Sequence, residues 1–444
     1  MTNAGSTACR SPLAVCLLCA VAPAAFAQPG RQAPGESLQL RALYQQALEA
    51  DPRTREFALQ VAQTDLRVRN VEVERRPVLS ALGSAQYQSD VPTAPFTLPG
   101  GQPVFSPPHD VYDASLRVDQ RIVDPALEPR VALARADLAE TQARLRTALF
   151  GLRQQVDEAF FAAALLEERM AALAAAITDL EARLRETDAR VREGAALAGE
   201  AAAVEATLLE RRQQREEARA SRRAALTRLG RLTGRSIEDE AVLVVPDLNA
   251  TVADGRSRMD ALRSRPEYEQ FQRTRDRVSR QQDLADAQDR PQLFAFGRIG
   301  YGKPGLNFVS GQFETYALGG VQLQWKAWGW GTARREREAL ALQQEIVAAE
   351  EAAFTAGVRR NVETDLAAID RLQTVLAMDD RIVALRETVE RGARARFQEG
   401  VVTASEFLDR TGERLAAQFA RAGRRVELAQ AGARVLTTLG LEVP

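Results

Sequence analysis

The feature that most restricts the fold is an internal duplication, in which the second half of the 444-residue chain repeats the first. At an offset of 214 positions Arg76-Pro77 aligns with Arg290-Pro291, and at an offset of 206 Glu193-Gly194 aligns with Glu399-Gly400. The other identical positions, numbered as in the first half, are Pro52, Phe57, Leu79, Ala81, Gly83, Tyr87, Arg190 and Glu200. A chain duplicated in this way repeats one supersecondary unit, so its two halves are expected to share one order of elements.

Each unit is predicted to hold a helix, a strand pair and a long helical hairpin. The first helix is expected to end at Pro77 or Pro291, because proline lacks a backbone N–H. The first hairpin carries apolar residues at alternating spacings of four and three from Leu166 to Leu184, which is typical of a coiled coil. The heptad pattern of the second hairpin is looser, and Asp365 and Asp379 interrupt it. In the first repeat, 28–234, we expect the helix at 37–75, strands within 78–119 and the hairpin at 125–231. After an equatorial connector at 235–257, the second repeat, 258–444, has its helix at 258–289, strands within 292–326 and hairpin at 332–440.

The predicted strands alternate between apolar and polar residues. Tyr112, Ala114, Leu116 and Val118 share one face, and Asp113, Ser115, Arg117 and Asp119 share the other. This alternation suits either a soluble sheet or a membrane barrel with a wet lumen. Strands of roughly 9–11 residues match a tilted bilayer crossing. Trp325, Trp328 and Trp330 gather after the last strand like an interfacial aromatic belt, so we expect a barrel.

The N-terminus has the pattern of a signal peptide at 1–27. Arg10 precedes an apolar run, and Ala25-Phe26-Ala27 resembles a cleavage site, so we expect cleavage after Ala27 and secretion. All three cysteines lie in this segment, so the mature chain is expected to have no thiol. Val15 and Leu18 stand before the last two cysteines, where a lipoprotein signal needs a small residue, so lipidation is not expected. No later apolar run approaches the ~20 residues of a spanning helix, which leaves strands as the expected crossing elements.

Charge and residue types exclude several functions. The formal net charge of -1, from 59 basic and 60 acidic residues, gives no field that would gather nucleic acid. His109 is the single histidine and lies in a proline-rich loop, which argues against a catalytic triad or a histidine metal site. No phosphate-binding or dinucleotide-binding motif stands at a helix start. We therefore expect no enzyme activity, no catalytic residues, no cofactor and no metal.

The strand count predicts an oligomer. One chain supplies four strands, whereas about eight are needed to close a barrel. Two chains would give eight strands and an interior filled by side chains, and three would give twelve and an open lumen. A function in permeation needs an open lumen and therefore favours three chains. The helices carry charges on most turns, so they are expected to project from the membrane.

Several local motifs resemble those of the TolC-like outer-membrane efflux proteins. Ala47-Leu48-Glu49-Ala50-Asp51-Pro52 is similar to the opening motif of that family, and Arg76-Pro77 and Arg290-Pro291 are similar to its entries into the barrel. The segments RIVD, from Arg121, and WKAWG, from Trp325, resemble its exits. Most specific is RFQEGVVTASEFLD, from Arg396 to Asp409, which resembles its turn at the periplasmic tip.

The resemblance implies a mixed α/β membrane protein, in which a trimeric twelve-stranded outer-membrane barrel continues into a long periplasmic coiled-coil barrel. It also implies an exit duct for tripartite efflux or type I secretion in a Gram-negative cell. The partners would be outer-membrane lipid, a periplasmic adaptor and an inner-membrane RND, ABC or MFS pump. Acidic side chains at the positions of Glu406 and Asp409 would ring the tunnel entrance, with Glu200 as the counterpart of Glu406 in the first repeat.

Other readings of the tip residues remain open. Gly194 and Gly400 are expected to form the helical-tip turns, where adaptor tips would dock, because glycine adopts positive φ freely. Thr403 and Glu406 also fit a capping box, in which Glu406 would stabilise only the helix start. The family often has a tyrosine and a basic residue where this chain has Phe397 and Val402, so entrance closure in this chain would need other contacts. The alternative function is a periplasmic coiled-coil scaffold or adaptor without a barrel, and the exported substrate is not identified.

Overall fold

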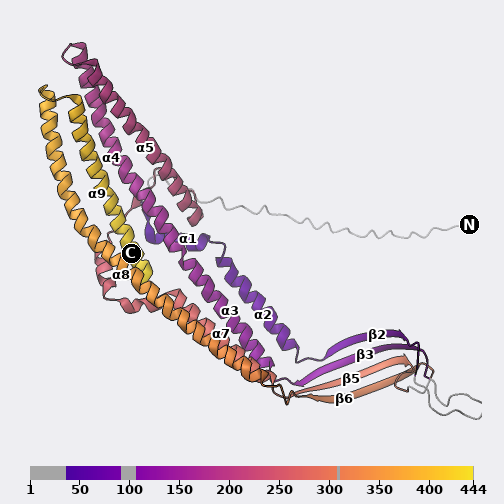
Figure 1. The fold of residues 1–444 in the computed structure, drawn as a ribbon. Helices are drawn as coiled ribbons and strands as arrows, with labels where there is room; N and C mark the ends of the chain where they lie inside the picture. The colour runs from indigo at the N-terminus through magenta and orange to yellow at the C-terminus, as the bar shows by residue number, and fades with distance from the viewer. Residues whose placement is uncertain (1–36, 92–106, 308–310, 444) are drawn as a thin grey trace, which may run out of the picture.

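The computed structural model describes residues 37–91, 107–307 and 311–443, so the predicted signal peptide at 1–27 lies outside the described residues. The molecule is elongated (Figure 1). A sheet lies at one end, the turns of two helical hairpins lie at the other, and a wider middle region joins them. No helix in the described ranges is long and apolar enough to cross a membrane.

The sheet combines one strand pair from each repeat. Its strands are β2 (Val78–Tyr87), β3 (Asp110–Val123), β5 (Gln292–Lys303) and β6 (Glu314–Gln324). They pair antiparallel in the order β2-β3-β5-β6, so the two repeats meet between β3 and β5. Leu116 of β3 pairs with Ala81 on one side and Ile299 on the other. Because directly paired residues of an antiparallel sheet lie on the same face, this register places most of the apolar residues of the four strands on one face, although Phe296 and Leu318 lie on the other.

Two long helical hairpins extend away from the sheet (Figure 1). The first consists of α3 (Leu127–Phe150), α4 (Leu152–Arg192) and α5 (Ala198–Thr233), and the second of α8 (Thr332–Gln398) and α9 (Ala404–Leu439). The outgoing arm of the hairpin predicted at 125–231 is divided at Gly151 into α3 and α4, although Gly151 itself has helical φ and ψ of -62° and -16°. The 67 residues of α8 extend about 100 Å at ~1.5 Å per residue.

The first helix of each repeat is interrupted, whereas the sequence pattern predicts one helix at 37–75 and one at 258–289. The first region forms β1 (Ser37–Gln39), α1 (Leu40–Ala50) and α2 (Thr54–Val73). The second forms a 3₁₀ turn, η1 (Met259–Ser264), and α7 (Pro266–Gln288). The breaks lie at Pro52 and Pro266, which occupy equivalent positions in the duplication. Proline cannot donate the hydrogen bond of a helix interior, so each proline begins or precedes a new helix.

The main hydrophobic core lies in the middle of the molecule. It joins α1, α4, α5, α8 and α9 with the connector, which contains β4 (Val242–Val244) and α6 (Asn249–Arg256). Parallel pairing of β1 with β4 places Leu38 beside Leu243, and both side chains are buried. The acidic interruptions in the second heptad pattern have partners on α9, because Asp379 lies 2.6 Å from Arg424 and Asp365 lies 3.6 Å from Arg434.

Candidate functional site

The apolar face of the sheet is exposed along its whole length. Leu79 is 67% exposed, Ile299 60% and Leu323 66%, although each stands in the interior of a paired strand. Eight residue steps separate Leu293 from Tyr301, which gives about 27 Å along β5 at ~3.4 Å per residue. With a strand tilt of 35–45° this length gives an apolar band about 19–22 Å tall, a few Å less than the ~25 Å of an outer-membrane barrel. The length of the face is therefore of the order of a lipid contact.

Aromatic side chains lie at both ends of this face. At the helix-proximal end, Trp325, Trp328 and Trp330 are 59%, 76% and 80% exposed, and the rings of Trp328 and Trp330 meet edge to face at 6.1 Å. At the loop end, the Phe313 ring stacks on Tyr301 at 5.3 Å and on Tyr112 at 6.1 Å. Sequence reasoning missed this second group, because only the strand register brings its members together. Aromatic residues at both edges of an apolar band are typical of the two membrane interfaces.

The opposite face of the sheet is polar and carries the predicted charges of β3. Arg298 of β5 lies 2.7 Å from Asp113, and Arg117 lies 2.8 Å from Asp119. Asp113, Arg117 and Arg298 are half-buried, whereas Leu116, Val118 and Ile299 on the apolar face are exposed. No other element packs on this face in Figure 1, so its side chains cover one another, as expected on the concave side of a curved sheet.

The turns at the far end of the hairpins have the same backbone structure. Gly194 has a φ of 73° and Gly400 has a φ of 72°. After each glycine a backbone N–H returns to the helix, from Ala195 to the carbonyl of Arg190 and from Val401 to that of Arg396, both at 2.8 Å. These bonds satisfy carbonyls that the helix end leaves free, and the left-handed glycine makes them possible.

The acidic residues of the tip stand near the starts of the returning helices. The Thr403 hydroxyl accepts a hydrogen bond from the Glu406 backbone N–H at 3.2 Å, which is the threonine half of the capping box. The Glu406 carboxylate lies 4.0 Å from Arg396 and is 43% exposed. Asp409 is exposed, and Glu200 is half-buried in the first turn of α5. Both hairpin tips lie at the same end of the molecule (Figure 1), so all three carboxylates share that end.

A small core that the sequence analysis missed ties the two tips together. Phe397 of α8 and Phe407 of α9 are each 1% exposed, and their rings stack at 5.5 Å. The guanidinium of Arg183, from α4, lies 4.7 Å from the Phe407 ring and 5.7 Å from the Phe397 ring. Arg394 and Asp179 add an ion pair of 3.0 Å between α8 and α4. Aromatic and charged contacts therefore join the hairpins in the place where the family tyrosine is replaced by Phe397.

The middle region contains a buried acid that the sequence did not indicate. Asp157 of α4 is 6% exposed, and the Tyr44 hydroxyl of α1 donates a short hydrogen bond to its carboxylate. Burial raises the pKa of Asp157 to about 7, although the bond from Tyr44 and the nearby Arg153 and Arg434 lower it. Burial and the neighbouring carboxylate also raise the pKa of Tyr44. This pair fastens α1 to the first hairpin.

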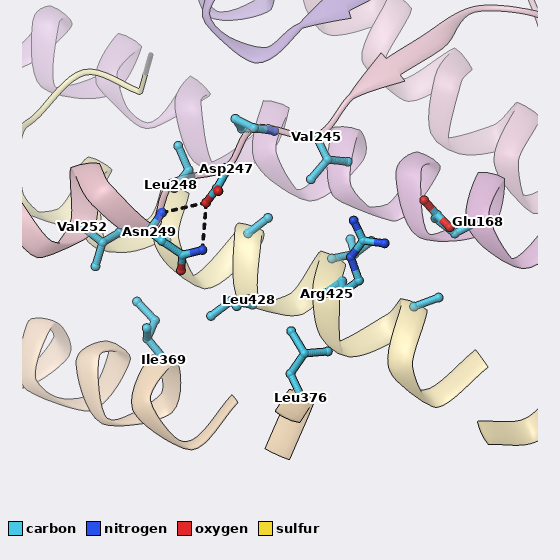
Figure 2. A pocket seen from close by; sticks show the side chains of 15 residues that line it. Glu168, Val245, Asp247, Leu248, Asn249, Val252, Ile369, Leu376, Arg425 and Leu428 are labelled. Carbon is cyan, nitrogen blue, oxygen red and sulfur yellow. Dashed lines mark hydrogen bonds between the residues drawn. The ribbon is translucent and has the colours of Figure 1, made fainter. Parts of the chain in front are cut away.

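A mostly apolar cavity of about 270 Å³ lies where the connector crosses the second hairpin. Figure 2 shows Leu248, Val252 and Ile369 along one part of its wall, and Arg425 and Glu168 along another. Asp247 accepts hydrogen bonds from the backbone and side chain of Asn249, which order the connector. None of the predicted site residues lines this cavity. No group of three or more side chains suited to a metal ion occurs within the described ranges.

Comparisons with known proteins agree with this architecture. Residues 43–235 match the family model described as outer membrane efflux protein. The outer membrane protein VceC of Vibrio cholerae has a TM-score of 0.66 at 16% identity, covering 90% of this chain and 96% of that chain. The outer membrane channel CmeC of Campylobacter jejuni has a TM-score of 0.65 at 14% identity, covering 90% and 85%.

The open-state structure of the MtrE outer membrane channel of Neisseria gonorrhoeae has a TM-score of 0.64 at 18% identity, covering 94% of this chain and 97% of that chain. No curated protein matches the chain by sequence. At these identities the solved structures establish the fold, and the family model matches the first repeat, over residues 43–235. The chain therefore carries an outer membrane efflux protein domain over residues 43–235 and has the fold of outer membrane efflux channels, which confirms the resemblance drawn from its sequence.

Proposed function

We propose that three copies of this chain form a passive exit duct across the outer membrane of a Gram-negative cell. Each copy supplies four strands to a twelve-stranded barrel, and the helical hairpins form a tunnel in the periplasm. The duct serves tripartite efflux or type I secretion with a periplasmic adaptor and an inner-membrane pump. The observation that carries the proposal is the exposed apolar face of the sheet, bounded by aromatic residues at both ends.

Unpartnered surfaces of the single chain support the trimer. The sheet ends at β2 and β6, and pairing β2 of one copy with β6 of the next closes the barrel and removes both edges. On α2, Leu59, Leu66 and Val73 are exposed at a spacing of seven, which is the stripe of a coiled-coil seam. On α8, Met378, Ile382, Leu385 and Val389 form a second exposed stripe. A soluble scaffold would leave all of these surfaces in water.

The tip residues have roles in this proposal. Glu406 and Asp409 form an acidic entrance ring, to which Glu200 contributes, and such a ring favours cations over anions. The turns at Gly194 and Gly400 dock the adaptor. Trp325, Trp328 and Trp330 contact lipid headgroups at the periplasmic edge of the barrel. The Thr403 cap uses only the backbone of Glu406, which leaves its carboxylate available to the entrance.

Planar-bilayer conductance of the detergent-extracted protein tests the proposal. Wild type should form cation-selective pores that a trivalent cation blocks from the tip side, and Glu406→Gln/Asp409→Asn should lose the block and part of the selectivity. Glu345 and Glu350 are both exposed on α8 far from the tip, so Glu345→Gln/Glu350→Gln, which also removes two carboxylates per copy, is the charge-matched control and should behave like wild type. Pores that are equally blocked in all three proteins would refute the acidic entrance. Failure of wild type to form any pore would refute the duct itself.

A further inference from the structure

Two aromatic rings on the polar face of the sheet lie against glycines of the opposite strand. Gly300 of β5 pairs directly with Tyr316 of β6, and Phe296 of β5 pairs directly with Gly320 of β6. A Cβ atom added to Gly300 would stand 2.5 Å from the Tyr316 ring and 2.8 Å from the Ser115 Cβ, and one added to Gly320 would stand 3.0 Å from the Phe296 ring. Each ring therefore occupies the space that a side chain on the opposite strand would need, and it lies flat on the sheet.

Each ring in turn supports a guanidinium group. Arg298 lies over the Tyr316 ring at 5.6 Å, and Arg117 lies over the Phe296 ring at 5.7 Å. Arg298 also donates to Asp113 at 2.7 Å and to the Ser115 hydroxyl at 3.0 Å, and the Tyr316 hydroxyl donates to Asp113. Arg117 donates to Asp119 at 2.8 Å and 3.0 Å. The same spatial arrangement, in which a glycine contacts a ring, the ring an arginine and the arginine a carboxylate, thus occurs twice on this face.

The contacts hold long side chains close to the sheet. An unpaired arginine extends freely into solvent, whereas stacking on a ring and bonding to a carboxylate fix its position. The Arg298 side chain is 31% exposed and that of Asp113 is 18% exposed, although no other element covers this face in Figure 1. Each arginine is matched by a carboxylate, so the two clusters carry no net charge.

We propose that the Gly300–Tyr316 and Gly320–Phe296 pairs set the width of the barrel lumen and keep its charges paired along the wall. The inference rests on the proposed duct, in which the apolar face meets lipid and the polar face therefore meets the lumen. Three copies would place six such clusters around the lumen. The glycines leave the space that the rings occupy, and the rings hold Arg117 and Arg298 away from the pore axis. Solutes of either sign therefore pass through a wide lumen whose wall carries no net charge.

Single-channel conductance of substituted proteins tests the width. Gly300→Ala should displace Tyr316 towards the pore axis in all three copies and lower the conductance below that of wild type. Gly297 lies three positions earlier on β5, on the apolar face beside Val118, and a Cβ there meets nothing within 4 Å, so Gly297→Ala is the control for an alanine in this strand that displaces no ring, and it should conduct like wild type.

The recovery test uses the second pair, because the Cβ added at Gly300 also meets the Ser115 Cβ at 2.8 Å, whereas the three atoms nearest to a Cβ added at Gly320 all belong to the Phe296 ring. Gly320→Ala should lower the conductance, and the double variant Gly320→Ala/Phe296→Ala should regain at least the wild-type value. Equal conductance of Gly300→Ala and Gly297→Ala, or no recovery in the double variant, would overturn the inference.

Reversal potentials in a salt gradient test the charge pairing. Asp113→Asn leaves Arg298 without its carboxylate, so the reversal potential should shift towards anion permeation. Adding Arg298→Gln to this variant restores neutrality and should return the potential to the wild-type value. An unchanged potential in Asp113→Asn would overturn the pairing role. Both experiments presuppose a conducting wild type, so loss of all wild-type pores refutes the duct, whereas conducting variants without these differences refute only the role of the clusters.

Discussion

Asp157 makes the stability of the middle region dependent on pH. Its carboxylate is buried under α1 and accepts a hydrogen bond from Tyr44, with Arg153, Glu158 and Arg434 as the other charged groups that act on it. Burial raises its pKa from 3.8 to about 7, so the folded protein keeps this proton through a range in which the unfolded chain has lost it. Folding therefore takes up a proton between about pH 4 and 7, and stability falls as the pH rises through that window.

The size of the effect follows from the shift in pKa. One pKa unit corresponds to about 1.36 kcal/mol, so a shift from 3.8 to about 7 costs about 4 kcal/mol at pH values above 7. Asp157→Asn removes the ionisation and keeps an oxygen that can accept the Tyr44 hydrogen bond. The variant should therefore gain stability relative to wild type by an amount that grows from about pH 4 to pH 7 and is constant above pH 7.

Thermal unfolding of the detergent-extracted protein, followed by circular dichroism between about pH 4 and 8, measures this difference. With an unfolding entropy of about 2.1 cal/mol/K per residue, 4 kcal/mol corresponds to a rise in Tm of about 4 °C at pH 8. Asp188 is exposed on the same helix, so Asp188→Asn is the control that removes a charge without removing a burial cost. A gain from Asp157→Asn that is independent of pH, or that shrinks as the pH rises, would contradict the reasoning.

Two further predictions concern the helical tips. Phe407→Ala deletes a ring that stacks on Phe397 and Arg183, which should cost about 3–5 kcal/mol locally. Hydrogen exchange should then accelerate in both tips and stay unchanged in the middle core, and equal acceleration everywhere would contradict a separate tip core. Gly400→Ala should destabilise the tip by about 1 kcal/mol, because alanine is strained at a φ of 72°. Gly392→Ala, at a helical position of α8 where a Cβ meets nothing within 4 Å, should instead stabilise it by about 0.5–1 kcal/mol. A Tm that changes in the same direction for both substitutions would refute the left-handed conformation of Gly400 as the cause of the difference.

Local patterns in the sequence contained much of the fold. Alternation of residue types indicated strands at 78–87 and 111–119, and the structure has strands at Val78–Tyr87 and Asp110–Val123. Duplicated glycines indicated the tip turns, because few other residues adopt positive φ without strain. The helix breaks at Pro52 and Pro266 could also have been predicted, because the duplication places the two prolines at equivalent positions. They were missed because the apolar pattern continues across them, although proline opposes a continuous helix.

Features that depend on long-range contacts could not be predicted in this way. Arg183 was indistinguishable from the many solvated arginines of the helices, yet it is 5% exposed between two phenylalanine rings. The bond between Tyr44 and Asp157 joins residues 113 positions apart, and no local period marks either of them. The ring–glycine pairs require the register between β5 and β6, which alternation alone leaves undefined. For such residues the burial of a charge, and not its position in a pattern, is the informative observation.

The burial of charged and apolar side chains also explains why the tip end and the sheet end of the molecule differ. At the tips, charged residues surround a small core that the two hairpins complete between them, so this end can face water as a single copy. At the sheet, the apolar side chains point outward and the charges are paired on the inner face, which is the reverse of a soluble protein. Such an arrangement is stable only where lipid covers the outer face and neighbouring strands cover the edges of β2 and β6. In the proposed trimeric duct, membrane insertion and strand pairing between copies are therefore expected to be coupled, since neither surface is covered by the other event alone.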